Sequence, residues 1–263
     1  MISLQPKPAS RNEPDSCVIF GPPKIGKNTL LVGLPNHYVF ELQPKGMDAI
    51  SGGSYDYYLT WQALDAGIAE FRSLPPEAKP RFVCVDHMGL LEEFSFTKAF
   101  DEYKRMHPGT KATTMNELIT LMPNNTGWYL PRAQFTAYLR AFAEISDTLI
   151  ITGHVKPKSI EDNVREADLG DMDLIGKNSR LLAGAFQVIG RLLRDKAGVV
   201  TMSTRNTSDG KQAITAGCNF AYLADRDIVL SKRNPDLSVT TFWHEVFPSL
   251  KVGTDQAKQT ATT

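Results

Sequence analysis

The fold follows from one stretch of the chain, Gly21-Pro22-Pro23-Lys24-Ile25-Gly26-Lys27-Asn28-Thr29. It has the spacing of a phosphate-binding loop, which is a glycine, four residues, Gly-Lys and then a polar residue. Glycines let the backbone turn tightly and bring its N–H groups onto phosphate oxygens. The lysine places an ammonium on the outer phosphates, and the N-terminus of the next helix adds partial positive charge. The stretch therefore predicts that these nine residues bind a nucleotide.

The flanking residues favour this interpretation over a plain turn followed by a helix with a surface lysine. Ser16–Phe20 is a short apolar run of β-formers, which predicts a buried strand entering the loop. Thr29–Leu34 is apolar and predicts a short helix that Pro35 ends. Because prolines carry no backbone N–H, we expect the amides that cradle phosphate to come from Lys24 to Thr29.

One position departs from the pattern. The residue after the lysine is normally Ser or Thr, whose hydroxyl binds Mg²⁺, but here it is Asn28, and a hydroxyl follows only at Thr29. An amide oxygen can ligate Mg²⁺, although it lies one bond further from the backbone. Nucleotide binding and efficient hydrolysis are therefore separate predictions.

A second signal is Arg81–Asp86, an apolar run that ends in a carboxylate. It predicts a buried parallel strand with Asp86 at its tip, where the carboxylate holds Mg²⁺; the alternative is an Asp that caps the following helix. His87 follows in place of Glu, which disfavours families whose catalytic base comes directly after this Asp. The remaining arrangement takes the base from a neighbouring strand, and the strand predicted at 37–42 offers Glu41 and Gln43.

A third strand with a polar tip is predicted at Thr148–His154. His154 is placed to sense the γ-phosphate, or it is simply a hydrogen-bonded histidine at a strand end. Lys156 and Lys158 follow in a loop, from which they can reach a phosphate of this subunit's nucleotide, of a neighbour's, or of DNA.

These elements predict an α/β fold with a mostly parallel sheet flanked by helices, including helices at 61–74 and 131–146. We expect a flexible lead-in at 1–14, one domain at 15–250 and a disordered tail at 251–263.

Within the domain, 88–133 is a helical insertion, whose lysines and aromatics suit a solvated helix face or a nucleic-acid surface. Residues 159–180 are polar and predict a mobile loop, and 186–215 predict an added antiparallel β meander. Five arginines are candidates to act between subunits: Arg191, Arg194, Arg205, Arg226 and Arg233.

Composition bounds the partners. The 29 basic and 29 acidic residues cancel, so no global field attracts the chain to nucleic acid or membrane, and DNA binding would need a local patch. Cys17, Cys84 and Cys218 lack metal-ligand spacing and suit free thiols in a reducing compartment. Met1–Pro14 is polar, and no apolar run has membrane-spanning length. We expect a soluble, cytoplasmic protein with no membrane partner.

Five stretches in this order carry a resemblance. They are Gly-Pro-Pro-Lys-Ile-Gly-Lys (21–27), Val-Phe-Glu-Leu-Gln-Pro-Lys-Gly (39–46), Phe-Val-Cys-Val-Asp (82–86), Gly-Trp (127–128) and Ile-Ile-Thr-Gly-His-Val-Lys-Pro-Lys (150–158). Over about residues 15–235, the chain resembles the RecA-like P-loop ATPases of bacteriophages, including phage single-strand-annealing ATPases and related nucleotide-binding proteins. The resemblance implies a RecA-like core, ATP with Mg²⁺, self-assembly into a homo-oligomer, and a role on single-stranded DNA in phage recombination or replication.

Two departures from the family pattern leave more than one function compatible with the sequence. Asn28 replaces Ser or Thr, and Gln43 stands where the resemblance implies a glutamate that polarises the attacking water. Glutamine orients water but is no base, whereas Glu41 points to the same strand face and is a candidate substitute. The alternatives are an ATP-hydrolysing DNA recombination protein, a weakly catalytic protein in which ATP controls assembly, and a small-molecule kinase. The long insertion and the meander count against the kinase.

Overall fold

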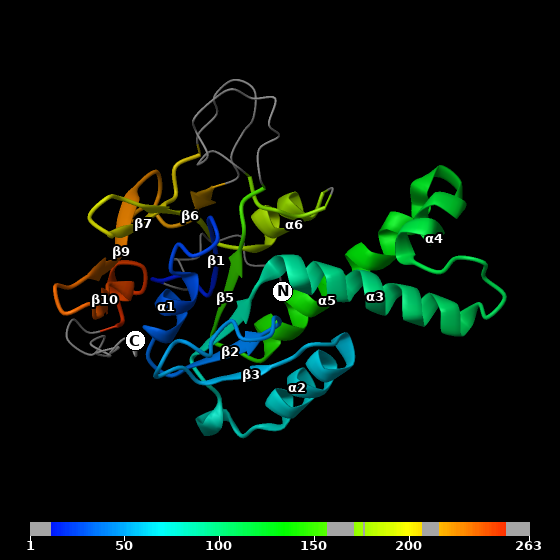
Figure 1. The fold of residues 1–263 in the computed structure, drawn as a ribbon, viewed down its shortest axis with the longest axis horizontal. Coiled ribbons are helices and arrows are strands. Elements are labelled where there is room, and N and C mark those ends of the chain that lie inside the picture. The colour runs from blue at the N-terminus through cyan, green and yellow to red at the C-terminus, as the bar shows by residue number, and fades with distance from the viewer. Residues whose placement is uncertain (1–11, 157–170, 176, 207–215, 251–263) are drawn as a thin grey trace, which may run out of the picture.

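A ten-stranded sheet forms the centre of the molecule, with helices on both faces (Figure 1). The computed structural model describes residues 12–156, 171–175, 177–206 and 216–250. The predicted lead-in, polar loop and tail fall largely or wholly outside these ranges, and so does Lys158. No helix in the described ranges is long and apolar enough to cross a membrane.

The strands are β1 (Ser16–Phe20), β2 (His37–Glu41), β3 (Tyr55–Tyr57), β4 (Phe82–Asp86), β5 (Thr148–Gly153), β6 (Val188–Arg194), β7 (Val200–Ser203), β8 (Gly217–Cys218), β9 (Asp227–Arg233) and β10 (Val239–Thr241). The α-helices are α1 (Lys27–Val32), α2 (Trp61–Ser73), α3 (Met88–Met106), α4 (Met115–Leu121), α5 (Tyr129–Glu144) and α6 (Asn178–Ala185). Short 3₁₀ helices are η1 (Pro76–Ala78), η2 (Pro123–Trp128) and η3 (Trp243–Glu245).

The sheet order is β10-β9-β7-β6-β1-β5-β4-β2-β3, with β8 paired to β6. The strands from β6 to β3 run parallel, whereas β7, β9 and β10 continue the sheet in antiparallel pairs. One strand, β5, lies between the glycine-loop strand β1 and the Asp86 strand β4. This confirms the predicted fold class, a mostly parallel sheet flanked by helices with an antiparallel addition.

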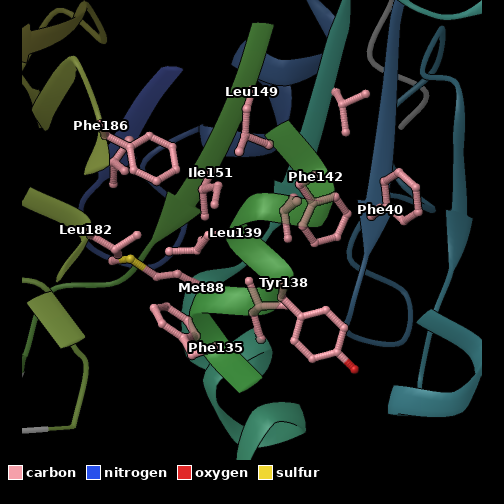
Figure 2. Packing of buried hydrophobic residues seen from close by; sticks show 14 of the residues in the cluster. Phe40, Met88, Phe135, Tyr138, Leu139, Phe142, Leu149, Ile151, Leu182 and Phe186 are labelled. Atoms are coloured by element: carbon pink, nitrogen blue, oxygen red, sulfur yellow. The ribbon is translucent and has the colours of Figure 1, made fainter. Parts of the chain in front are cut away.

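The parallel strands are apolar throughout because both of their faces are covered. Along β1, Val18 and Phe20 face one hydrophobic cluster, and Cys17 and Ile19 face another. The first cluster lies under α2, α3, α5 and α6 and contains the aromatic rings and aliphatic side chains of Figure 2. The second lies under α1 and η3. The glycine loop and the tips of β2, β4 and β5 are therefore supported from both sides.

The insertion forms an arm with its own small core. Phe100, Met115, Leu118 and Ile119 are buried together, apart from the two clusters of the sheet, and α4 stands away from the sheet in Figure 1. Met88 and Leu91, at the start of α3, belong instead to the sheet's first cluster. The predicted insertion at 88–133 thus begins with a helix that is rooted in the main core.

Several boundaries differ from the sequence prediction. Helix α1 begins at Lys27 and not at Thr29, because Gly26 takes a left-handed φ of 107° and caps it. Strand β3 was not predicted, and its three residues are an edge strand beside β2. The meander predicted to end at 215 continues with β9 and β10, whose mixed polar sequence gives little strand signal.

Candidate functional site

The glycine loop joins β1 to α1 at the carboxyl end of the parallel strands. Gly26 is left-handed, and an ideal Cβ there would lie 3.0 Å from Nη2 of Arg194, so a side chain is disfavoured for two reasons. Lys24 also has a positive φ, of 63°. The helix that follows is short, and its first amides face the same side as the loop.

Lys27 lies over its own loop. Its Nζ donates to the carbonyls of Gly21 at 3.1 Å and Pro22 at 3.0 Å, and lies 3.2 Å from Nδ1 of His154. The side chain is buried, and burial lowers its pKa to about 8 against the opposing attraction of Asp86. Because a charged lysine only donates, Nδ1 of His154 accepts.

Asp86 lies at the tip of β4, 1% exposed, with its carboxylate fixed on both sides. Oδ1 accepts the hydroxyl of Thr152 from β5, and Oδ2 accepts Nε2 of Gln43 at 3.4 Å. The strand register also places Glu41 of β2 directly beside Asp86. Parallel strands that end at one edge of the sheet thus bring together groups that are far apart in sequence. The sequence prediction assigned no role to Thr152, which the structure shows as a hydrogen-bond partner of Asp86.

Glu41 and Gln43 occupy different places at the tip of β2. Glu41 is fully buried, its Oε1 accepts the backbone N–H of Gln43 at 3.1 Å, and its Oε2 has no hydrogen-bond partner among the described residues. Burial, and secondly the charge of Asp86, raise the pKa of Glu41 to about 8. Gly46 closes over it, since an ideal Cβ there would lie 2.5 Å from Oε2. Gln43 lines the open cavity, whereas Glu41 lies behind it.

Asn28 is held by Gly46. Its Nδ2 donates to the Gly46 carbonyl at 3.0 Å. Because a carbonyl oxygen can only accept, this contact fixes the orientation of the amide and leaves Oδ1 available as an acceptor or metal ligand. Asn28 thereby keeps an oxygen at the cavity, where the usual pattern has a hydroxyl.

Two histidines lie side by side at this edge. The rings of His87 and His154 meet edge to face, with centroids 4.6 Å apart. His87 caps α3 by accepting the N–H of Gly89 at 3.2 Å. Burial lowers its pKa to about 4 despite Asp86, so His87 is neutral at pH 7. Burial, and then Lys27, also lower the pKa of His154.

These groups surround a cavity of about 470 Å³. It extends from Gln43 and Asp86, over Lys27 and His154, to Arg194 and Arg233. Of the predicted loop residues, those lining it are Pro23, Lys24, Gly26, Lys27, Asn28 and Thr29. Gly21, Pro22 and Ile25 form the back of the loop; Gly21 packs against Leu192, and Ile25 is buried.

The arginines separate into two groups. Arg194 and Arg233 line the cavity of their own chain. Arg191 is buried in the sheet, Arg205 pairs with Asp227 at 3.3 Å, and Arg226 donates to the Tyr222 carbonyl at 2.9 Å. The sequence could not separate them, because the antiparallel pairing that decides their positions was only partly predicted.

The residues present suit Mg²⁺ bound with a phosphate ligand. No cluster of three or more His, Cys, Asp or Glu in the described ranges could hold a metal by itself. Mg²⁺ is commonly held by one or two carboxylates together with substrate phosphates. The carboxylate of Asp86 and the amide oxygen of Asn28, both from residues that line the cavity, form an oxygen donor set of that kind.

A family model described as an AAA domain matches residues 13–214. The chain belongs to this AAA domain family. The match covers the glycine loop and the strands from β1 to β7, and ends before β9 and Arg233. No curated protein matches the chain. Membership of a P-loop ATPase-like AAA family indicates nucleotide binding and ATPase activity.

Proposed function

We propose that this AAA domain binds ATP with Mg²⁺ in the cavity above the glycine loop and hydrolyses it slowly. We further propose that it does so as a homo-oligomer on single-stranded DNA, in phage recombination or replication, in the cytoplasm of the host cell. The observation that carries the nucleotide proposal is the convergence of Lys27, Asp86 and Gln43 on one cavity, from three separate strand ends.

The roles follow from the contacts. Lys27 exchanges the carbonyls of Gly21 and Pro22 for the outer phosphates, helped by the N-terminus of α1. Asp86, oriented by Thr152, supplies the carboxylate for Mg²⁺. Bound Mg²⁺ would neutralise charge that develops on the transferred phosphoryl group. Gln43 orients the attacking water, but it cannot take the proton.

Asp86 is assigned to Mg²⁺, and Glu41 is a second carboxylate beside Gln43 that could take that proton. Its Oε1 contacts the backbone N–H of Gln43, but with a pKa of about 8 it is mostly protonated at pH 7. A base that is mostly protonated and lies behind the cavity wall supports slow turnover that rises as the pH passes 8.

The DNA part of the proposal rests on the resemblance to phage RecA-like ATPases and on one local feature. The insertion arm carries three exposed cations, Lys104, Arg105 and Lys111, whereas its Lys98 is neutralised by Asp65 at 2.7 Å. With zero net charge over the chain, DNA binding requires such a local patch. The free thiols of the three cysteines suit a reducing compartment.

The test is to measure ATP binding and ATP turnover together, with Mg²⁺, with and without single-stranded DNA, beside Lys27→Ala. Turnover that rises with single-stranded DNA and disappears in Lys27→Ala supports the whole proposal. Turnover that is indifferent to DNA rejects the DNA part alone. A wild-type chain that binds no ATP rejects the nucleotide proposal.

A second function is favoured by the protonated, buried Glu41 together with Gln43. In it, ATP is a structural ligand that controls assembly and is not turned over. Tight ATP binding without turnover, and a change in oligomeric state on addition of ATP, would support this alternative. Light scattering with ATP and with ADP measures that change.

A further inference from the structure

We propose that Arg194 and Arg233 bind the polyphosphate of the nucleotide held by their own chain, from the side of the cavity opposite Asp86. The proposal rests on the nucleotide site described above and adds to it. It concerns two cations on the antiparallel strands, and it replaces the expectation that these arginines act between subunits.

Arg194 lies against the middle of the glycine loop. It is the last residue of β6, which runs parallel to β1, so it ends at the same edge of the sheet as the loop. Its Nη2 donates to the Ile25 carbonyl at 2.6 Å and lies 3.0 Å from the position of an ideal Cβ on Gly26. One nitrogen therefore holds the loop, and Arg194 is also one of the residues that line the cavity.

Arg233 reaches the same edge through the strand directions. Strand β7 runs antiparallel to β6, with Val200 opposite Arg194, and β9 runs antiparallel to β7, with Ser231 opposite Val200. The carboxyl end of β9 therefore returns to the edge where β6 ends. The backbone of Arg233 pairs with β10, but its side chain makes no hydrogen bond or ion pair with any described residue, and Arg233 lines the cavity.

The antiparallel strands are fixed to the helix that begins at the loop. The indole Nε1 of Trp243 donates to the Leu30 carbonyl at 2.7 Å, and the hydroxyl of Thr241 donates to the Gly33 carbonyl at 3.3 Å. Both side chains are buried. Because β10 pairs with β9, these contacts set the distance between Arg233 and α1 within one chain.

The chemistry of a triphosphate suits this arrangement. The two lysines that line the cavity, Lys24 and Lys27, do not balance the several negative charges of a triphosphate, and no described carboxylate is ion-paired with Arg194 or Arg233. Guanidinium groups bind phosphate oxygens in pairs, through parallel N–H bonds. Mg²⁺ beside Asp86 and two guanidiniums on the far side would neutralise the ligand from both ends. The family match ends at residue 214, so family membership does not cover Arg233.

The deciding variant is Arg233→Ala, since its side chain is exposed and holds no other described residue. We expect ATP to bind roughly tenfold more weakly, with a smaller dependence on salt, because one phosphate contact is lost. Inorganic tripolyphosphate should compete with ATP in the wild type and lose affinity in the variant by a similar factor, which separates phosphate binding from contacts to base or ribose. Arg194→Ala should weaken binding at least as much, because it also frees Ile25.

Arg205→Ala is the matched control. Arg205 follows β7, is about half exposed and pairs with Asp227 outside the cavity. Its removal should leave ATP affinity unchanged. Thermal unfolding of each variant checks that the fold is retained.

A mixing experiment separates action within a chain from action between chains. Lys27→Ala chains carry an intact Arg233 but cannot bind ATP, so they are added in excess to Arg233→Ala chains. If Arg233 serves its own chain, the Arg233→Ala chains keep their weakened ATP affinity in the mixture. If the added Lys27→Ala chains restore that affinity, the proposal is overturned. Normal ATP binding by Arg233→Ala alone also overturns it, while a wild type that binds no ATP overturns the nucleotide site itself.

Discussion

The two sides of the cavity are built differently. On the side of β2, β4 and β5, Asp86 and Glu41 are buried; Asp86 is held by Thr152 of the neighbouring strand, and Glu41 by the backbone N–H of Gln43 just beyond its own strand. On the side of β6 and β9, Arg194 and Arg233 are exposed, and the described contacts hold only Arg194, through one carbonyl. The first side has buried carboxylates with fixed partners, and burial raises the pKa of Glu41, whereas the second side has charges at the surface.

This difference teaches which property each side controls. Buried carboxylates with fixed partners are suited to chemistry, because small displacements of a metal or water change the barrier steeply. Exposed guanidiniums are suited to binding, because they neutralise charge without demanding one geometry. Changes on the carboxylate side should therefore alter turnover and stability, whereas changes on the arginine side should alter affinity and its salt dependence.

The largest effect is expected for Asp86→Asn. The shape is kept, and the hydroxyl of Thr152 still has an oxygen to donate to, but the charge that holds Mg²⁺ is lost. We expect Mg²⁺-dependent turnover to fall by at least roughly a hundredfold. ATP binding measured in EDTA should change little. The assay is steady-state phosphate release beside equilibrium binding.

Asp101→Asn is the control for this change. Asp101 accepts the indole N–H of Trp61 at 2.9 Å on the surface of α3 and does not line the cavity. The turnover of the Asp101→Asn variant should match that of the wild type. If Asp86→Asn kept normal turnover, Asp86 would be a structural carboxylate and not a metal ligand.

A smaller effect, of opposite sign, is expected for Gln43→Glu. The change supplies a carboxylate that lines the cavity, where the wild type can only orient water. We expect turnover to rise by about tenfold at saturating Mg²⁺. Without Mg²⁺ the variant should be less stable, because the Gln43 Nε2 contact to Asp86 at 3.4 Å is replaced by like charges. A fall in turnover would mean that losing the contact between Gln43 and Asp86 slows the reaction more than the introduced carboxylate speeds it.

Most of the carboxylate side could be predicted from sequence. Its strands are buried on both faces, so 16–20, 82–86 and 148–153 are continuous apolar runs, and parallel strands must end at one edge. That places Lys27, Asp86 and His154 together before any coordinates are known. The sequence does not reveal that Glu41 is closed off by Gly46, because this depends on the path of the turn at 43–46.

The arginine side could not be predicted in the same way. Strand β9 has only a three-residue apolar run, Ile228–Leu230, with Asp227 before it and Ser231 and Lys232 after it, so its β signal is weak. Without β9 the position of Arg233 is undefined. Arg194 was placed on a strand, but its contact with Ile25 depends on the pairing of β6 with β1, which sequence patterns do not specify.

The next effect is on stability and depends on pH. The folded state raises the pKa of Glu41 to about 8, so it holds a proton that the unfolded chain loses near pH 4.5. Stability from this group is therefore present at low pH and is lost as the pH rises through 8. The stability that Glu41→Gln gains over the wild type should therefore be larger at pH 9 than at pH 6, by about 2 to 3 kcal/mol or roughly 5 to 8 °C in Tm, because the wild type loses stability over the two pH units between 6 and 8.

Thermal unfolding at pH 6 and pH 9 measures this difference. Glu117→Gln is the control, because Glu117 is an exposed side chain of α4 far from the cavity, and it should show no gain at pH 9. An equal Tm gain for Glu41→Gln at both pH values would contradict the raised pKa of Glu41.

The smallest effect on the nucleotide site is expected for Trp243→Phe. The indole bond to Leu30 is lost, but that carbonyl also accepts the N–H of Gly33 at 3.1 Å, so no buried acceptor is left without a partner. Unfolding should become easier by about 1 kcal/mol, or roughly 3 °C in Tm, and ATP affinity should stay within about twofold. Trp61→Phe loses a similar bond at the surface and is the matched control. A tenfold loss of ATP affinity in Trp243→Phe alone would mean that the anchoring of β10 to α1 positions the arginines for the phosphates, and that the arginine side is as exacting as the carboxylate side.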